Sequence, residues 1–170
     1  MNDDTQQHDE PVEIERKYLL SRCPELPPDA VAHRIAQGYL PDDDPDSEGR
    51  VRRKVAPDGT ERFTHTIKRG RGVVRTEIER TIDTEEFEKL WRRTEGRRLT
   101  KVRHQVPAGE LVWEIDVFDE IDVVLAEIEL PTATTEVEPP DWLRDVIVRE
   151  VTDEATFRNY ELACKKAARP

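Results

Sequence analysis

The chain of 170 residues lacks the signatures of several protein classes. It contains no run of 18 apolar residues, which excludes a membrane-spanning helix. Its formal net charge of -11 argues against a protein that binds bulk nucleic acid, because such proteins are normally basic. There is no Gly-x-x-x-x-Gly-Lys loop and no Gly-x-Gly-x-x-Gly fingerprint, so phosphates are not held at a helix N-terminus of that kind.

Cysteine is also scarce. Cys23 and Cys164 are far apart in the sequence, and neither lies in a metal-ligand or nucleophile motif. We therefore expect two reduced thiols in a cytoplasmic protein rather than a disulfide. Residues 1–11 are acidic and polar with no apolar h-region, so we expect a flexible tail before a single domain of residues 12–170.

Charged residues recur at alternate positions inside segments that otherwise have the composition of β-strands. In the first such segment Glu13, Glu15 and Lys17 alternate with Ile14 and, further on, Tyr18. Side chains two residues apart on a strand point to the same face of the sheet. Because the pattern returns on strand after strand with charges of both signs, it favours a sheet curled so that its charged faces meet.

Periodicity and turn signals predict eight strands and two or three helices. The strands are expected at residues 12–20, 30–40, 50–56, 61–69, 73–82, 98–106, 110–118 and 123–130. Asp83, with Glu86 three residues later, predicts a helix N-cap, and Gly96 predicts the end of that helix. A helical turn is expected near Trp142 and a terminal helix from Thr152 or the next residue. Short connections favour antiparallel pairing, and eight strands suffice to close a barrel.

Three of the predicted strands carry a pair of carboxylates on one face. These pairs are Glu13 and Glu15, Glu114 and Asp116, and Glu127 and Glu129. Clustered hard oxygen ligands suit Mg²⁺ or Mn²⁺ rather than Zn²⁺. A single pair is more often part of a solvated face. The three pairs together favour a metal site, because Leu125, Ile128 and Leu130 make the last strand too apolar for a surface strand.

Basic residues occupy the same predicted face. They are Lys17, Arg50, Arg52, Lys68, Arg75, Lys101 and Arg103. Arginine matches phosphate oxygens with two parallel hydrogen bonds, and lysine supplies a point charge. Acidic and basic groups nearly balance, which an enclosed site requires because unpaired buried charge is costly. Acids for metal and bases for phosphate together indicate a metal-complexed, polyanionic phosphate ligand.

The segment Val12-Glu13-Ile14-Glu15-Arg16-Lys17 resembles the N-terminal Glu-x-Glu-x-Lys signature of the CYTH superfamily, also called triphosphate tunnel metalloenzymes. Further segments are similar to the family pattern in its order, namely Gln37-Gly38-Tyr39-Leu40, Arg50-Val51-Arg52, Thr66-Ile67-Lys68, Arg75-Thr76-Glu77-Ile78-Glu79, Lys101-Val102-Arg103, Glu114-Ile115-Asp116 and Glu127-Ile128-Glu129. The resemblance covers roughly residues 12–167 and is greatest to the small single-domain bacterial members.

The resemblance implies an α+β fold, an eight-stranded antiparallel β-barrel that forms a tunnel, with helices packed outside and a C-terminal helix near one mouth. It implies metal-dependent hydrolysis of inorganic triphosphate to pyrophosphate and phosphate. The triphosphate would be bound by Lys17, Arg50, Arg52, Lys68, Arg75, Lys101 and Arg103. Divalent metal, Mg²⁺ or Mn²⁺, would be held by Glu13, Glu15, Asp116, Glu127 and Glu129. Catalysis would involve Glu13, Glu15, Lys17, Glu77, Glu79 and Glu114, of which the last three could hold a second metal or its waters.

Two other functions stay open at this point. One is a different activity of the same superfamily, either an adenylate cyclase or a thiamine or nucleoside triphosphatase. The other is a non-catalytic module that binds polyphosphate. The sequence shows no dedicated adenine pocket, and the intact carboxylate pairs speak against the module. We expect a small-molecule triphosphate as the ligand, with no nucleic acid and no membrane as partner, and either a monomer or a homodimer.

Overall fold

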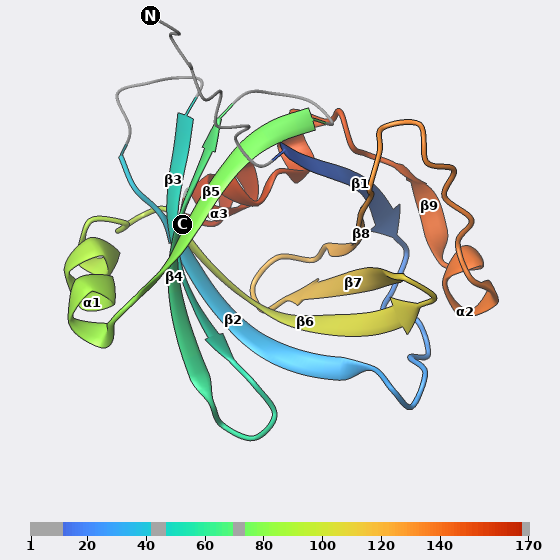
Figure 1. Ribbon diagram of the computed structural model, residues 1–170, viewed down its shortest axis with the longest axis horizontal. Coiled ribbons are helices and arrows are strands. Elements are labelled where there is room, and N and C mark those ends of the chain that lie inside the picture. The colour runs from blue at the N-terminus through green and yellow to red at the C-terminus, as the bar shows by residue number, and fades with distance from the viewer. Residues whose placement is uncertain (1–11, 42–46, 70–73, 168–170) are drawn as a thin grey trace, which may run out of the picture.

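The computed structural model of the protein describes residues 12–41, 47–69 and 74–167 (Figure 1). The strands are β1 (Val12–Leu20), β2 (Val31–Tyr39), β3 (Ser47–Val55), β4 (Glu61–Arg69), β5 (Val74–Ile82), β6 (Arg98–Ala108), β7 (Leu111–Phe118), β8 (Val124–Glu129) and β9 (Ile147–Glu150). The helices are α1 (Thr84–Arg92), α2 (Asp141–Arg144), α3 (Asn159–Ala167) and the short 3-10 helix η1 (Ala155–Phe157). The tail predicted at residues 1–11 lies outside the described residues.

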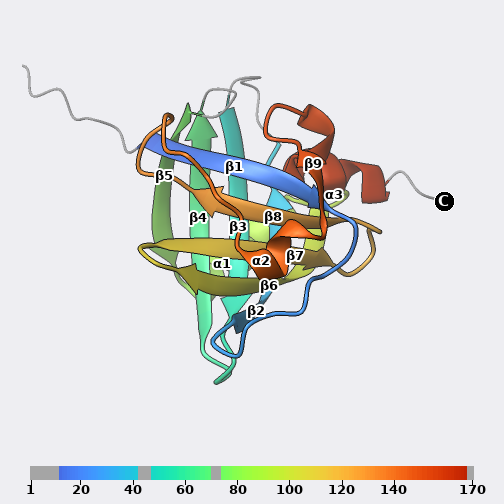
Figure 2. The same ribbon diagram turned by 90° about the vertical axis from the view of Figure 1, so that its right-hand side faces the viewer.

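The strands form one antiparallel sheet in the order β5-β4-β3-β2-β6-β7-β8-β1-β9. β1 also pairs with β5, where Glu13 stands opposite Arg75, so the strands from β5 round to β1 meet again at their two ends. Figures 1 and 2 show the resulting curled sheet, with the walls formed by β3–β5 and by β6–β8 on opposite sides. Antiparallel pairing is confirmed. The strand count of eight was wrong, because the four-residue β9 adds to β1 beside Tyr18–Leu20.

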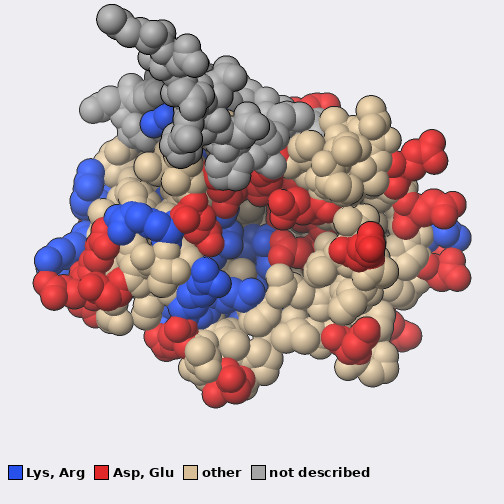
Figure 3. Space-filling model, viewed as in Figure 1, with Lys and Arg blue, Asp and Glu red and all other residues tan. Residues whose placement is uncertain are grey.

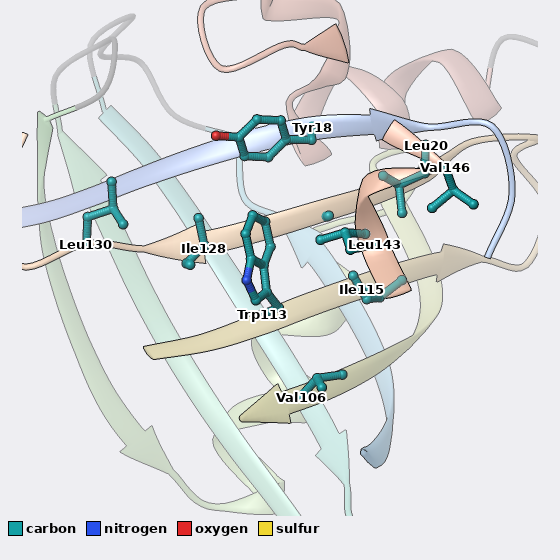
Figure 4. Packing of buried hydrophobic residues seen from close by; sticks show 10 residues of the cluster. Tyr18, Leu20, Val106, Trp113, Ile115, Ile128, Leu130, Leu143 and Val146 are labelled. Atoms are coloured by element: carbon teal, nitrogen blue, oxygen red, sulfur yellow. The ribbon is translucent and has the colours of Figure 1, made fainter. Parts of the chain in front are cut away.

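The main hydrophobic core lies on the outer face of this sheet. Tyr18, Trp113 and Ile128 project outward and pack beneath Leu143 and Val146 (Figure 4). The rings of Tyr18 and Trp113 lie 5.6 Å apart between centroids. Burial of these outer side chains stabilises the curled sheet from outside, so its inner face is left for polar groups.

Apolar residues also close one end of the inner face. Phe118 stands opposite Lys101, and Leu125 stands opposite Asp116, so both apolar residues share the face that carries the charges. They form a buried cluster with Leu162 of α3. The inner face is therefore polar along most of its length, and hydrophobic contacts with α3 close it at this end.

The expected cap of α1 is present. Asp83 accepts a hydrogen bond from the backbone N–H of Glu86 at 2.8 Å, whereas the Glu86 side chain binds Arg80 rather than returning to the cap. The terminal helix begins at Asn159, later than predicted, because η1 and an extended Arg158 precede it. No helix in the described ranges is long and apolar enough to cross a membrane.

A close backbone approach fixes β2 against the turn after α1. A Cβ on Gly38 would lie 2.4 Å from Oγ1 of Thr94, whose side chain is fully buried. Thr94 cannot rotate away without cost, since its hydroxyl donates to the Trp91 carbonyl at 2.8 Å and accepts from Arg98. A glycine at position 38, next to Tyr39, is therefore required for β2 to pack against Thr94.

We expect Gly38→Ala to lower the free energy of unfolding by about 1–3 kcal/mol, as overpacking does. Urea denaturation measures the loss. In a Thr94→Gly background the same substitution should cost less, since the clashing side chain is gone. An equal cost in both backgrounds would contradict the steric explanation.

Candidate functional site

A cavity of about 690 Å³ opens on the inner face of the sheet. Figure 3 shows it as a hollow in which blue and red side chains meet. Most residues predicted for the site line this cavity, namely Glu13, Glu15, Lys17, Arg50, Arg52, Lys68, Glu77, Glu79, Arg103, Glu114, Glu127 and Glu129. They come from β1, β3, β4, β5, β6, β7 and β8, so the curl of the sheet brings together groups that are distant in sequence.

Three predicted residues are placed differently. Lys101 and Asp116 are fully buried and do not line the cavity. They lie on the same inner face but beyond the cavity, because their positions along β6 and β7 are close to the sealed apolar end. The backbone of Arg75 pairs with Glu13, but its side chain lies outside the described part of the structure.

Arg103 is the centre of a buried charge network. Its Nε donates to Oδ1 of Asp116 at 2.7 Å, and its Nη2 donates to Oδ2 of the same carboxylate at 2.6 Å. Nη2 also donates to Oε2 of Glu127 at 2.6 Å, and Nη1 donates to Glu114. Lys101 completes the network with an Nζ to Oδ2 distance of 2.5 Å to Asp116. Arg103 is therefore already bound by three carboxylates.

The network is reflected in the pKa values of its members. Burial acts to raise the pKa of Asp116, but Arg103 and Lys101 outweigh it and hold that pKa below its usual range. Burial likewise opposes ionisation of Glu127, and Lys17 and Arg103 bring its pKa well below normal. These carboxylates are ionised and charge-compensated within the protein wall.

The cations nearer the cavity also have carboxylate partners. Nζ of Lys17 lies 2.9 Å from Oε1 of Glu127. Nζ of Lys68 lies 2.5 Å from Glu13 and 2.7 Å from Glu77. Arg50 is 3.4 Å from Glu77 as well. The positive charges of these inner-face cations are thus neutralised by neighbouring carboxylates.

Arg52 is different from these cations. Among the described residues no carboxylate lies within ion-pairing distance of its guanidinium, and its buried Nε has no hydrogen-bond partner. Burial and the positive charges of Arg50 and Arg103 lower the pKa of Arg52 to about 10. Its positive charge is therefore available to an anion without breaking an existing ion pair.

Carboxylates crowd one another at the opposite rim. Burial raises the pKa of Glu129, and the negative charges of Glu13, Glu77 and Glu114 raise it further. Glu15 stands directly opposite Glu129 on the neighbouring strand. Such like-charge crowding favours a bound cation.

The acidic rim has the donor chemistry of a hard divalent metal. Carboxylate oxygens are the ligands that Mg²⁺ and Mn²⁺ prefer. Within the described ranges no three acidic, histidine or cysteine side chains converge on one point as a ready-made metal site. The residues therefore fit the metal by chemistry and excess negative charge, and their side chains must turn from their lysine and arginine partners to hold it.

The cavity contains residues that the sequence pattern did not assign to the site. These are Tyr39, Gln105, Glu48, Glu110, Arg158 and Asn159, with several apolar residues at the mouth. The hydroxyl of Tyr39 accepts a hydrogen bond from Nε2 of Gln37 at 2.7 Å, and burial raises its pKa well above normal. Tyr39 of β2 stands opposite Arg50 of β3 and shares its face, so strand pairing could have identified it. Arg158 directly precedes α3, and Asn159 is the first residue of that helix.

Comparisons with known proteins agree with one another. No model of a protein family matches the chain. An inorganic triphosphatase of Nitrosomonas europaea is 38% identical over 157 residues, which are 89% of this chain and 96% of that protein. A crystal structure of the inorganic triphosphatase NE1496 is 32% identical with a TM-score of 0.61, covering 89% of this chain and 94% of the other. The PH1012 protein of Pyrococcus horikoshii OT3, at 17% identity and a TM-score of 0.52 over 72% of this chain and 80% of its own, shares the fold.

Asp116→Asn should lower the free energy of unfolding by about 3–5 kcal/mol, because it removes the carboxylate that pairs with buried Lys101 and one of the three carboxylates that bind Arg103. Chemical denaturation at neutral pH measures this. A loss below about 1 kcal/mol would show that Asp116 does not hold the network.

Glu129→Gln should raise the urea midpoint at neutral pH. A raised pKa in the folded state means that ionisation of Glu129 destabilises the protein as pH rises through that pKa. Below the ordinary glutamate pKa both proteins carry a neutral group, so the gain should vanish there. A gain that is independent of pH, or a loss at neutral pH, would contradict the crowding of carboxylates at the rim.

Proposed function

This chain belongs to the CYTH-type inorganic triphosphatases, and from that premise we propose that it hydrolyses inorganic triphosphate to pyrophosphate and phosphate within the cavity. The main support for the proposal is that basic and acidic side chains line the same cavity. The basic residues are Lys17, Arg50, Arg52 and Lys68, and the acidic ones are Glu13 and its neighbouring carboxylates. Phosphate requires the first set and a divalent metal requires the second. The relatives named as inorganic triphosphatases support the choice of substrate.

We propose further that the curled sheet is a tunnel-shaped barrel and that the reaction takes place inside it. The pairing of β1 with both β5 and β8 supports it, because the strands from β1 round to β8 then form a ring. The cluster around Phe118 and Leu162 stops one end. A substrate held in this space is shielded from bulk water, which strengthens every charge interaction with it.

Substrate binding proceeds by exchange of ion pairs. Arg52 is the first contact, since it has no carboxylate to give up. Lys17, Lys68 and Arg50 then exchange their carboxylate partners for phosphate oxygens. Tyr39 remains protonated because of its raised pKa, so its hydroxyl can donate to the same anion. Arg103 lines the cavity and Lys101 lies beyond it, and Asp116 fixes both side chains.

The carboxylates released in this exchange fit Mg²⁺ or Mn²⁺. Glu13, Glu15, Glu127 and Glu129 would hold the ion, and Glu77, Glu79 and Glu114 could hold a second ion or its waters. When bound, the metal neutralises phosphate charge and lowers the pKa of coordinated water. Asp116, although expected as a ligand, is committed to Arg103 and Lys101 and keeps a positioning role.

In the reaction a water oxygen attacks a terminal phosphorus as the bridging P–O bond breaks. A carboxylate of the acidic rim that is not bound to the metal accepts the proton of the water. Pyrophosphate leaves with its developing charge stabilised by Arg50, Arg52 and Lys17. The products are one phosphate and one pyrophosphate.

Nucleotide substrates and a purely binding role are less well supported. Tyr39 is the only aromatic residue among the described residues that line the cavity, and it is 1% exposed, so it offers no open face for stacking a base. A passive binding module would not require carboxylates crowded at Glu129. We also propose a cytoplasmic enzyme, which the free thiols of Cys23 and Cys164 suit.

The direct test is release of phosphate and pyrophosphate from tripolyphosphate with Mg²⁺ or Mn²⁺, compared with ATP and thiamine triphosphate. Triphosphate should be hydrolysed fastest, and chelation by EDTA should stop the reaction. Cyclic AMP from ATP would indicate the cyclase instead, and no turnover of any substrate would indicate the binding module.

Arg52→Ala should raise KM for triphosphate roughly tenfold to a hundredfold, because charge-assisted hydrogen bonds to the anion are lost. Arg53→Ala is the matched control. Arg53 lies on the same strand, points to the other face and pairs with Glu61, so its removal should leave KM unchanged. Equal effects of the two substitutions would contradict the role of Arg52.

A further inference from the structure

A row of basic residues continues beyond the triphosphate cavity along β3 and β4. Lys54 follows Arg52 two positions later on β3, and Arg62 of β4 stands directly opposite Lys54. Side chains of opposed residues share a face, so all three lie on the inner face. Arg62 is exposed and Lys54 is partly buried, which places this row at the edge of the cavity rather than within it.

These cations have no carboxylate partners among the described residues. Nζ of Lys54 donates a hydrogen bond to Oε1 of Gln105 at 3.4 Å, and Nη2 of Arg62 donates to Oγ1 of Thr81 at 3.4 Å. Both contacts are long and neutral. By contrast, the outward-facing Arg53, which lies between Arg52 and Lys54 in the sequence, is bound by Glu61. An ordinary solvated basic strand would show no such difference between its two faces.

The local field is positive as a consequence. Burial lowers the pKa of Lys54, and Arg103, Arg52 and Arg62 lower it further against the opposing effect of Glu114. This mirrors the acidic rim, where carboxylates raise one another's pKa. One edge of the cavity therefore lacks positive charge and the other lacks negative charge.

The pKa of His33, on the neighbouring strand β2, is also affected by this positive charge. Burial and Lys54 lower the pKa of His33, and its buried Nδ1 has no hydrogen-bond partner. His33 is therefore neutral at physiological pH and adds a polar group without adding a competing negative charge. Figure 3 shows blue side chains leading from the hollow to its lower edge.

We propose that Arg52, Lys54 and Arg62 form a phosphate subsite that binds the additional phosphates of linear polyphosphates longer than triphosphate. The row suits an extended polyanion, because positions i and i+2 on a strand are about 6.8 Å apart and present successive cations along one line. The chain of such a ligand leaves the triphosphate site over Arg52 and follows the row to the surface. The inference rests on the proposed function, since it extends the substrate of that site.

The test compares tripolyphosphate with linear tetraphosphate and a medium-chain polyphosphate. Binding is measured by calorimetry in EDTA, so that hydrolysis does not interfere, and turnover is measured separately with Mg²⁺. The variants are Lys54→Ala/Arg62→Ala and the charge-reversed Lys54→Glu/Arg62→Glu, with Arg53→Ala as the matched control. Thermal unfolding of each variant verifies that it is folded, as expected for partly exposed positions.

The wild type should bind the longer chains more tightly than triphosphate. The double alanine variant should reduce the preference for longer chains over triphosphate roughly tenfold, and charge reversal should reduce it further. Arg53→Ala should leave that preference as in the wild type. A wild type that binds all chain lengths equally, or a double variant whose preference matches that of Arg53→Ala, would overturn the subsite.

These outcomes are separate from the fate of the proposed function. If the wild type releases no phosphate from triphosphate, the hydrolytic function fails, while the chain-length preference in EDTA still tests the subsite. If triphosphate is hydrolysed but chain length has no effect on binding, the subsite alone is overturned.

Discussion

The structure depends on mutual neutralisation of charges that the curled sheet encloses. Arg103 shows the constraint most clearly, since its buried guanidinium binds Asp116, Glu114 and Glu127. Burying only the acidic or only the basic side chains would be too costly, because an isolated charge loses its hydration and gains no ion pair in exchange. The apolar core can lie outside the sheet, under α1 and α2, only because these pairs make a polar inner face tolerable.

Neutralisation is incomplete at two places, and these are where ligands are expected. Carboxylates exceed cations around Glu129, and cations exceed carboxylates around Lys54. The excess is stored as like-charge repulsion, which a ligand of opposite charge relieves. A metal ion at the first place and phosphate at the second satisfy both at once, so the reaction site and its extension follow from one uneven distribution of charge.

Alternation of side chains predicted which residues face inward, because a strand has only two faces. It could not predict depth. Lys101 and Asp116 have the same parity as Arg103 and Glu114, yet they are fully buried beyond the cavity, since depth is set by strand tilt and by the apolar end near Phe118. β9 was missed because four residues carry no clear period and its pairing with β1 is a tertiary contact. Arg158 and Asn159 reach the cavity from a helix start, where strand alternation has no meaning.

Substrate and metal are expected to replace ion pairs on the inner face while Asp116 keeps its contacts with Arg103 and Lys101. A crystal structure with Mn²⁺ and a non-hydrolysable imido analogue of triphosphate tests it most directly. Lys17 and Lys68 should leave Glu127 and Glu13 for phosphate oxygens, while Asp116 keeps both Arg103 and Lys101. A bound analogue with the Lys17–Glu127 and Lys68–Glu13 pairs unbroken would contradict it.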